Sequence, residues 1–415
     1  RGATAANMLQ FLHDFAQELY EFFNTGFSKT APRLEESKNI TPDYVFGLLS
    51  DQVSYDLDAI LRAYTQRNIV EALKDTKNPI SDKGEHLKIA DALAFEILEP
   101  AKVVGLVPSE STVLTYFQKD LRIRLMPYAP VAFVGLPFSA FKVPQDYVAL
   151  AHEIGHYVYH RGVQSPDRQH PVSVFISYYS KAPLPWYFHW LEELFADVFG
   201  CIIAGPAIAA SFQDLSLQYT RDESVLDDQR HPAPVLRPYI YIDALNALAE
   251  VPGLDNAGLK QVAGGLAINW REKAKWLPQE SAVRSRPTPS SSCVTDLNVE
   301  EARTQLKDVI KYLVSTTFEG LVRQVNSGSY DFQKVWGKPN GWESAANTNF
   351  DALKTLDVDK SDLNTSFTQP NSLFSDKMTG YGKRTNKLVQ ENEWLEVLTF
   401  GGWIEQGPGG GIAHG

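Results

Sequence analysis

The 415-residue sequence contains only two cysteines, Cys201 and Cys293, and fewer basic than acidic residues. Two cysteines cannot form the several disulfide bonds that stabilise small secreted domains, so a reducing compartment is favoured. With 39 lysines and arginines against 50 aspartates and glutamates, the formal net charge is −11. A surface this acidic makes nucleic acids and anionic membranes poor partners.

Long apolar runs and several common catalytic motifs are also missing. No uninterrupted hydrophobic run reaches the roughly 20 residues that a membrane helix needs, so we expect a soluble protein without integral membrane association. No GxSxG elbow or CxxC pair occurs, and residues 380–383 lack the spacing of a phosphate-binding loop. A cytoplasmic location is favoured, while a periplasmic or secreted location and the oligomeric state are left open.

The spacing of apolar residues predicts a mainly helical α+β protein with a small sheet. Helical periods cover residues 9–22, 41–73, 145–160, 190–204, 238–249, 256–276 and 299–325, whereas 122–125 and 129–135 have strand patterns. Composition predicts an N-terminal helical region (1–80), a core (81–278), a linker rich in Pro and Ser (279–296) and a C-terminal helical region (297–415). Within the last region, 394–400 predicts an amphipathic helix that docks on the body.

The main chemical signal is the pattern HExxH, formed by His152, Glu153 and His156. On a helix, residues four apart share one face with Cβ atoms about 5–6 Å apart, so both imidazoles can bind one metal ion. No proline interrupts residues 145–160, which supports the helix that the pattern needs. Glu153 would stand beside the metal and take a proton from water. The alternative is a pair of ordinary surface histidines beside a glutamate.

A third ligand would distinguish these alternatives. A histidine six residues after the motif is ruled out because Gly162 occupies that position, and His160 has the place of an ordinary helix-end histidine. The next helix offers Glu193, with Asp197 one turn later, where it can orient a ligand histidine. Glu192 is the rival ligand. Only Glu193 stands four residues before Asp197, so we expect Glu192 to face solvent.

The pairing of HExxH with a later ExxxD resembles that of the gluzincin zinc metallopeptidases, the group that includes thermolysin-like enzymes. The resemblance covers about residues 122–248 and implies a zincin-like core, to which the apolar spacing adds helical N- and C-terminal extensions. It implies His152, His156 and Glu193 as zinc ligands, Glu153 as general base and Asp197 as supporting acid. The run EELFADVFGC is also similar to the second motif of the heat-shock and prenyl-processing membrane peptidases, whose membrane helices are missing here.

Two histidines and one glutamate leave a fourth coordination position open, which is typical of a catalytic zinc site. We therefore expect one Zn²⁺ per chain and zinc-dependent hydrolysis of a bond in a peptide or protein substrate. The oxyanion needs a donor besides zinc. His231 is the first candidate, since its His-Pro segment followed by Arg237 is similar to one in those membrane peptidases, and Tyr239 and Tyr241 are the alternatives.

Two other classes of function remain. A catalytically silent or gated zincin-fold protein with a binding or regulatory role would keep the zinc, although such a protein has no need of Glu153. A helical scaffold with a chance motif would bind no zinc at all. The strand at 129–135 is either a core strand or, as in zincins, an edge strand that pairs with an extended substrate.

Overall fold

The computed structural model describes residues 42–72, most of residues 83–327 and the isolated positions 13, 14, 17, 20 and 21. The gaps within 83–327 are 120–121, 127–129, 142–143, 182–183, 218, 229, 253–255, 275–281 and 284–296. The helix expected at 394–400 lies outside the described residues. The division into four regions stays a prediction.

Helices dominate the described residues, and a small sheet accompanies them, which confirms the expected α+β class. The α-helices are α3 (Pro42–Ala72), α4 (Lys83–Val103), α5 (Leu150–Val163), α6 (Pro171–Tyr179), α7 (Leu191–Ala204), α8 (Pro206–Ser216), α9 (Arg221–Ser224), α10 (Arg237–Ala249), α11 (Asn256–Lys273), α12 (Val299–Tyr312) and α13 (Glu319–Ser327). Among them, none is both long and apolar enough to span a bilayer.

Short irregular helical turns modify two of the expected helices. The turn η4 (Pro144–Ala149) is a 3-10 helix that precedes α5, so the metal-motif helix begins later than its apolar pattern indicates. The single helix expected at 299–325 is interrupted by the π-helical segment η6 (Leu313–Thr317), which separates α12 from α13. Two further 3-10 turns are η3 (Phe138–Phe141) and η5 (Phe188–Trp190).

The main sheet has the strand order β1-β3-β2, with β1 at Thr112–Gln118, β2 at Arg122–Leu125 and β3 at Val131–Pro137. β1 and β3 are parallel, and β2 is antiparallel to β3. Of the two alternatives for the strand at 129–135, the structure shows the core strand, because β3 is the middle strand and is paired on both sides. β2 is the edge strand that contacts α5. A separate two-stranded ribbon joins β4 (Ala282–Val283) to β5 (Leu297–Asn298).

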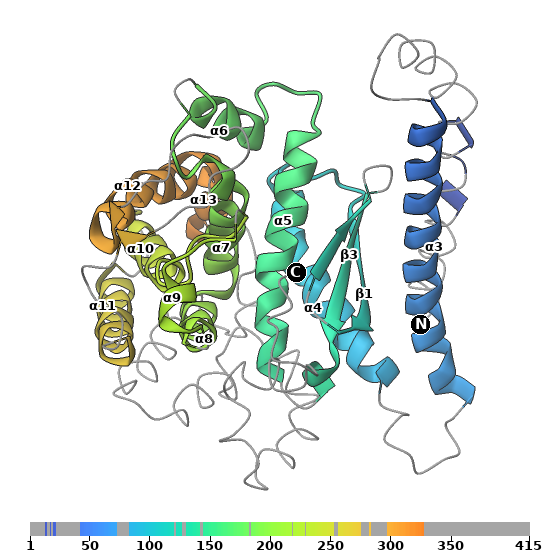
Figure 1. The fold of residues 1–415 in the computed structure, drawn as a ribbon, viewed down its shortest axis with the longest axis horizontal. Coiled ribbons are helices and arrows are strands. Elements are labelled where there is room, and N and C mark those ends of the chain that lie inside the picture. Colours follow the sequence, from blue (N-terminus) through green and yellow to red (C-terminus); the bar gives the residue numbers. More distant parts are fainter. Residues whose placement is uncertain are drawn as a thin grey trace, which may run out of the picture.

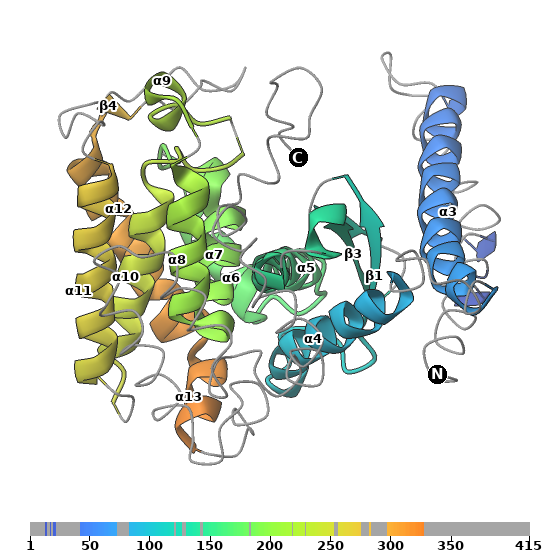
Figure 2. The ribbon, with the colours of Figure 1, turned by 90° about the horizontal axis from the view of Figure 1, so that it is seen from below.

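Both faces of the main sheet are covered, which explains why β3 is buried along its whole length. Side chains of a strand alternate between faces. Val131 and Phe133 pack with residues of α3, whereas Ala132 and Val134 belong to the main hydrophobic core. Figures 1 and 2 show α3 on one side of the sheet, with α4 and α5 on the other.

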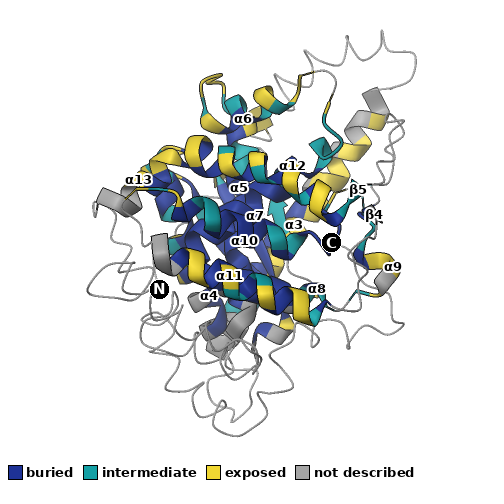
Figure 3. Cartoon of the chain, turned by 90° about the vertical axis from the view of Figure 1, so that its left-hand side faces the viewer, coloured by how far each residue is buried: buried dark blue, intermediate teal, exposed yellow. Residues whose placement is uncertain are grey.

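Helix α5 lies between the sheet and the group of helices from α6 to α13 (Figure 1). Its approach to α7 is very close, since a Cβ atom added at Gly155 would lie 2.8 Å from Cα of Ala196. Only glycine allows this contact without a backbone shift. Figure 3 shows α5, α7 and α10 at the centre of the molecule and mostly buried. The close approach brings the polar side chains of α5 and α7 together inside the core.

Candidate metal centre

The three expected ligands converge between α5 and α7. His152 and His156 lie one turn apart on α5, and their Nε2 atoms are 3.1 Å from each other. Glu193, in the first turn of α7, places Oε2 3.4 Å from Nε2 of His152 and Oε1 3.4 Å from Nε2 of His156. The three ligand atoms lie within 4.8 Å of one another. This group, here called the metal cluster, can hold a metal ion.

The chemistry and burial of the cluster fit a transition-metal ion such as zinc. All three residues are 5–8% exposed. Buried charged groups are costly unless an ion or a hydrogen-bonded partner compensates them. Two imidazole nitrogens and one carboxylate oxygen are ligands that zinc accepts in catalytic sites. The residues present therefore suit the expected ion.

A largely buried network supports His152 from one side. Nδ1 of His152 is buried and lies 2.9 Å from Oδ1 of Asp197, an ion-pair distance, and it has no partner in hydrogen-bond geometry. Asp197 accepts hydrogen bonds from Arg237 through both oxygens, at 2.7 and 3.1 Å, and from the Tyr241 hydroxyl at 2.6 Å. The Arg237 guanidinium lies over the ring of Phe212. Asp197 thus occupies the supporting position expected of it.

A more accessible pair supports His156 from the other side. Nδ1 of His156 lies 2.9 Å from Oε1 of Glu192, and Nε2 of His160 lies 2.8 Å from the same oxygen. The expectation that Glu192 faces solvent is wrong, because its carboxylate is directed to α5. His160 is likewise more than a helix-end histidine. Sequence spacing missed this pair, since only the packing of α7 against α5 brings Glu192 to it.

His231 reaches the metal cluster from the loop before α10. Its Nε2 lies 3.3 Å from Oε1 of Glu193. Its Nδ1 lies 2.6 Å from Oδ2 of Asp228, whose other oxygen accepts the backbone N–H of His231 at 2.7 Å. Asp228 therefore fixes both the ring and the backbone of His231. The neighbouring Asp227 is buried and accepts hydrogen bonds from His189 and Trp190 of η5, the turn just before α7, which holds this loop against the metal helices.

The two tyrosines proposed as alternative donors lie elsewhere. Tyr241 is buried and donates its hydroxyl to Asp197, so it belongs to the network behind His152. The ring of Tyr239 lies under the guanidinium of Arg303, whose Cζ is 4.5 Å from the centroid of the ring. Arg303 itself pairs with Asp243. Of the three proposed donors, His231 is the one that contacts a residue of the metal cluster.

Glu153 is anchored to the edge of the sheet. Its Oε2 accepts a hydrogen bond of 2.8 Å from the backbone N–H of Ile123 in β2. Burial acts to lower the pKa of His156, but Glu193 and Glu192 raise it, with a smaller contribution from Glu153. The carboxylate of the HExxH motif therefore connects the metal helix with the edge strand. No pattern in the sequence indicates this contact, because only the fold brings β2 and α5 together.

Opposite charges dominate the electrostatics of the metal-free cluster. Burial acts to lower the pKa of His152, but Asp197 and Glu193 raise it to about 10. Burial acts to raise the pKa of Glu193, but His156 and His231 lower it to about 2. Against burial, Arg237 holds the pKa of Asp197 far below its usual range. The metal-free protein thus holds protonated histidines against carboxylates, and a cation that bound there would displace protons.

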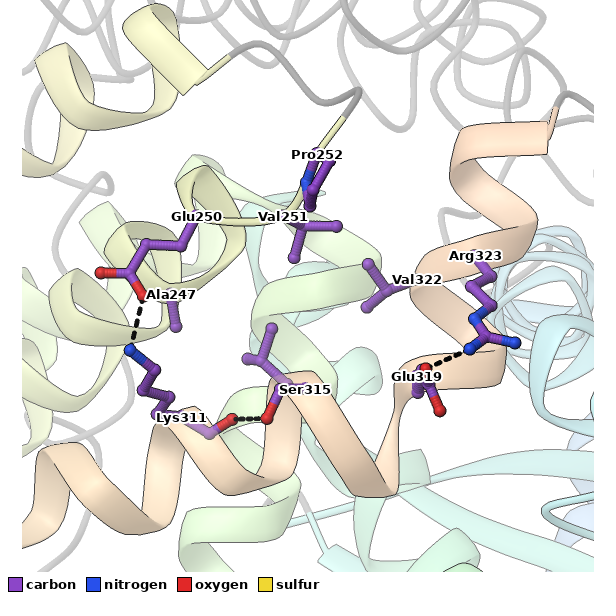
Figure 4. A pocket seen from close by; sticks show the side chains of 10 residues that line it. Ala247, Glu250, Val251, Pro252, Lys311, Ser315, Glu319, Val322 and Arg323 are labelled. Atoms are coloured by element: carbon purple, nitrogen blue, oxygen red, sulfur yellow. Dashed lines mark hydrogen bonds and ion pairs between the residues drawn. The ribbon is translucent and has the colours of Figure 1, made fainter.

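Apart from the metal cluster, a hollow lies between the end of α10 and the segment α12–η6–α13 (Figure 4). Its volume is about 360 Å³, and its walls are mainly apolar. The charged groups at its rim are paired with each other, Lys311 with Glu250 at 2.8 Å and Arg323 with Glu319. None of its lining residues belongs to the metal cluster. The hollow lacks the chemistry that the cluster offers.

Comparisons of the chain with protein-family models, with curated proteins and with solved structures gave no match. The residues of the metal cluster and their neighbours therefore carry the functional argument alone.

Proposed function

We propose that the chain is a zinc-dependent metallopeptidase of the gluzincin type. The observation that carries this proposal is the convergence of His152, His156 and Glu193 within 4.8 Å, from two helices that approach through Gly155. Three protein ligands leave room for water and substrate, as in catalytic rather than structural zinc sites. A zinc ion held there would lower the pKa of water and polarise a substrate carbonyl.

Glu153 acts as the general base in this proposal. It follows ligand His152 directly, and its charge already influences ligand His156. Its carboxylate takes a proton from the attacking water and transfers it to the leaving amine. The hydrogen bond from Ile123 holds one carboxylate oxygen, Oε2, at the edge strand. An extended peptide that pairs with β2 would therefore lie beside the base, by the general mode of strand addition.

His231 supplies the second donor for the oxyanion. The contact with Asp228 at Nδ1 leaves Nε2 directed to the cluster, 3.3 Å from Glu193. A donor fixed in this way stabilises developing negative charge without reorganising during the reaction. Asp228 thus has the role of a positioning residue for His231, which the sequence motif did not reveal.

The test compares wild type with Glu153→Gln in zinc content and in hydrolysis of a diverse peptide library. We expect equal zinc in both proteins and cleavage by wild type alone, with a loss of at least about 100-fold in the variant. Glu250→Gln, which removes a surface carboxylate far from the cluster, is the matched control and should cleave like wild type. Absence of zinc from wild type would refute the proposal.

The second candidate is a gated or catalytically silent zincin-fold protein that binds metal. The observation that favours it is the burial of all three ligands, together with Arg237, whose Nη2 lies 3.3 Å from Oε2 of Glu193. The same experiment separates the two functions. Full zinc without cleavage of any library peptide would support the binding protein over the peptidase.

A further inference from the structure

Three histidines follow one another at four-residue intervals along α5, at 152, 156 and 160. Residues with this spacing form a single stripe on a helix. The first two direct Nε2 to the metal cluster. His160 directs its Nε2 to Oε1 of Glu192, the same oxygen that contacts Nδ1 of His156. One carboxylate oxygen of α7 therefore bridges two successive turns of α5.

This arrangement determines how His156 presents itself to a metal. An imidazole that binds metal through Nε2 carries its proton on Nδ1, and the partner of that proton sets the plane of the ring. The partner here is Glu192. Its side chain is 36% exposed, so water competes for the carboxylate and its rotamers are not restricted by packing alone. A second donor on the same oxygen is needed to hold it in place.

We infer that His160, through Glu192, is a positioning residue for the metal ligand His156. The inference rests on the metal site of the proposed function. His160 holds Glu192, Glu192 holds the Nδ1–H of His156, and Nε2 of His156 is thereby directed to the metal. Within the described residues the metal-binding group contains His156 but not His160, so His160 acts without touching the ion.

The other ligand histidine provides an internal reference. His152 relies on Asp197, which is buried and already fixed by Arg237 and Tyr241. None of the contacts of that network includes His160 or Glu192. A change at His160 should therefore alter the environment of His156 and leave that of His152 unchanged.

The experiment uses cobalt as a spectroscopic probe in the full chain. Bound Co²⁺ shifts the exchangeable imidazole N–H resonances of both ligand histidines in the proton NMR spectrum. We expect His160→Leu to move one of the two resonances and to weaken zinc binding, measured by competition with a chelator, by about tenfold. Glu192→Gln should move the same resonance. His160→Gln, whose amide N–H can replace the imidazole donor, should restore the resonance and the affinity.

Glu250→Gln is again the matched control and should move neither resonance. The melting temperature of each metal-free variant should stay near that of wild type, since the side chain of His160 is 31% exposed. Wild-type resonances and wild-type zinc affinity in His160→Leu would overturn the inference and leave the metal site intact. Failure of wild type to bind either ion would overturn the proposed function, and the inference with it.

Discussion

The two candidate ligands His152 and His156 each have a carboxylate oxygen 2.9 Å from Nδ1, in very different surroundings. Nδ1 of His152 lies 2.9 Å from Asp197, whose side chain is 0% exposed and shared with α10. Nδ1 of His156 lies 2.9 Å from Glu192, whose side chain is 36% exposed. One carboxylate belongs to the core, and the other lies at its boundary. The same contact therefore contributes to folding at His152 and mainly to ligand orientation at His156.

The burial of the two carboxylates explains this difference. Removing one partner of a buried ion pair leaves the other charge without compensation in a medium of low dielectric constant. Without Asp197, Arg237 would lose its bidentate partner and keep the longer contact, 3.3 Å, with Glu193. Loss of a partly exposed carboxylate is compensated by water. The two sides of the metal cluster should thus respond very differently to the same substitution.

The largest expected effect tests this comparison directly. In metal-free protein, Asp197→Ala should lower the free energy of unfolding by about 3–5 kcal/mol. Glu192→Ala should lower it by about 1 kcal/mol or less. Urea unfolding followed by circular dichroism measures both values under identical conditions. Equal losses in the two variants would break the comparison and assign Glu192 to the folding core as well.

The metal cluster was accessible to prediction because its spacing is local. Both pairs, His152 with His156 and Glu193 with Asp197, stand four residues apart, so a single helical turn sets their geometry. The joining of the two helices could not be derived in the same way. It depends on Gly155, whose missing side chain lets α5 approach Ala196 of α7. The motif contains that glycine, but a pattern of two histidines gives it no role.

Contacts between distant segments account for most of what sequence spacing missed. The order of the strands placed β3 in the middle and β2 at the edge, although both have short apolar patterns. The contact between Glu192 and α5 depends on how α7 is oriented about its own axis. Apolar periodicity indicates that orientation only to within about one residue. Tyr241 carried the right chemistry for an oxyanion donor. Its position on the buried face of α10 directs it to Asp197 instead.

An intermediate effect separates the two tyrosines of α10. Tyr241→Phe removes one of the donors to Asp197 and should lower the free energy of unfolding by about 1–2 kcal/mol. Tyr239→Phe is the matched control and should change stability by less than about 0.5 kcal/mol, because the aromatic ring under Arg303 is kept. Thermal and urea unfolding of the two variants provide the measurement.

Kinetics extend the same comparison. Both phenylalanine variants should retain peptide hydrolysis in proportion to their folded and zinc-loaded fraction. A loss of kcat in Tyr241→Phe, at unchanged stability and zinc content, would show that the Tyr241 hydroxyl takes part in the reaction itself. The deep network would then serve catalysis and not only the support of His152.

The smallest expected effect is a difference in proton release. The pKa of His152 is raised from 6.5, its ordinary value, to about 10 in the metal-free fold. The protonated imidazole therefore stabilises this fold, and the contribution is fully present at pH values below 6.5. That contribution is lost as the pH rises from 6.5 through 10. Zinc requires the neutral imidazole, so zinc affinity should rise across the same range.

At pH 7.5, binding of zinc should therefore release about one proton from His152, with a further contribution from His156. Asp197→Asn removes a negative charge that raises the pKa of His152, so it should reduce the release at that histidine. Glu192→Gln removes a charge that contacts His156 and His160, and it should leave the release of the proton from His152 unchanged. Calorimetric titration with zinc in two buffers of different protonation enthalpy counts the protons. An equal reduction of proton release in the two variants would show that His152, Asp197, His156 and Glu192 titrate as one unit. The buried pair at His152 and the more exposed pair at His156 would then no longer be distinct.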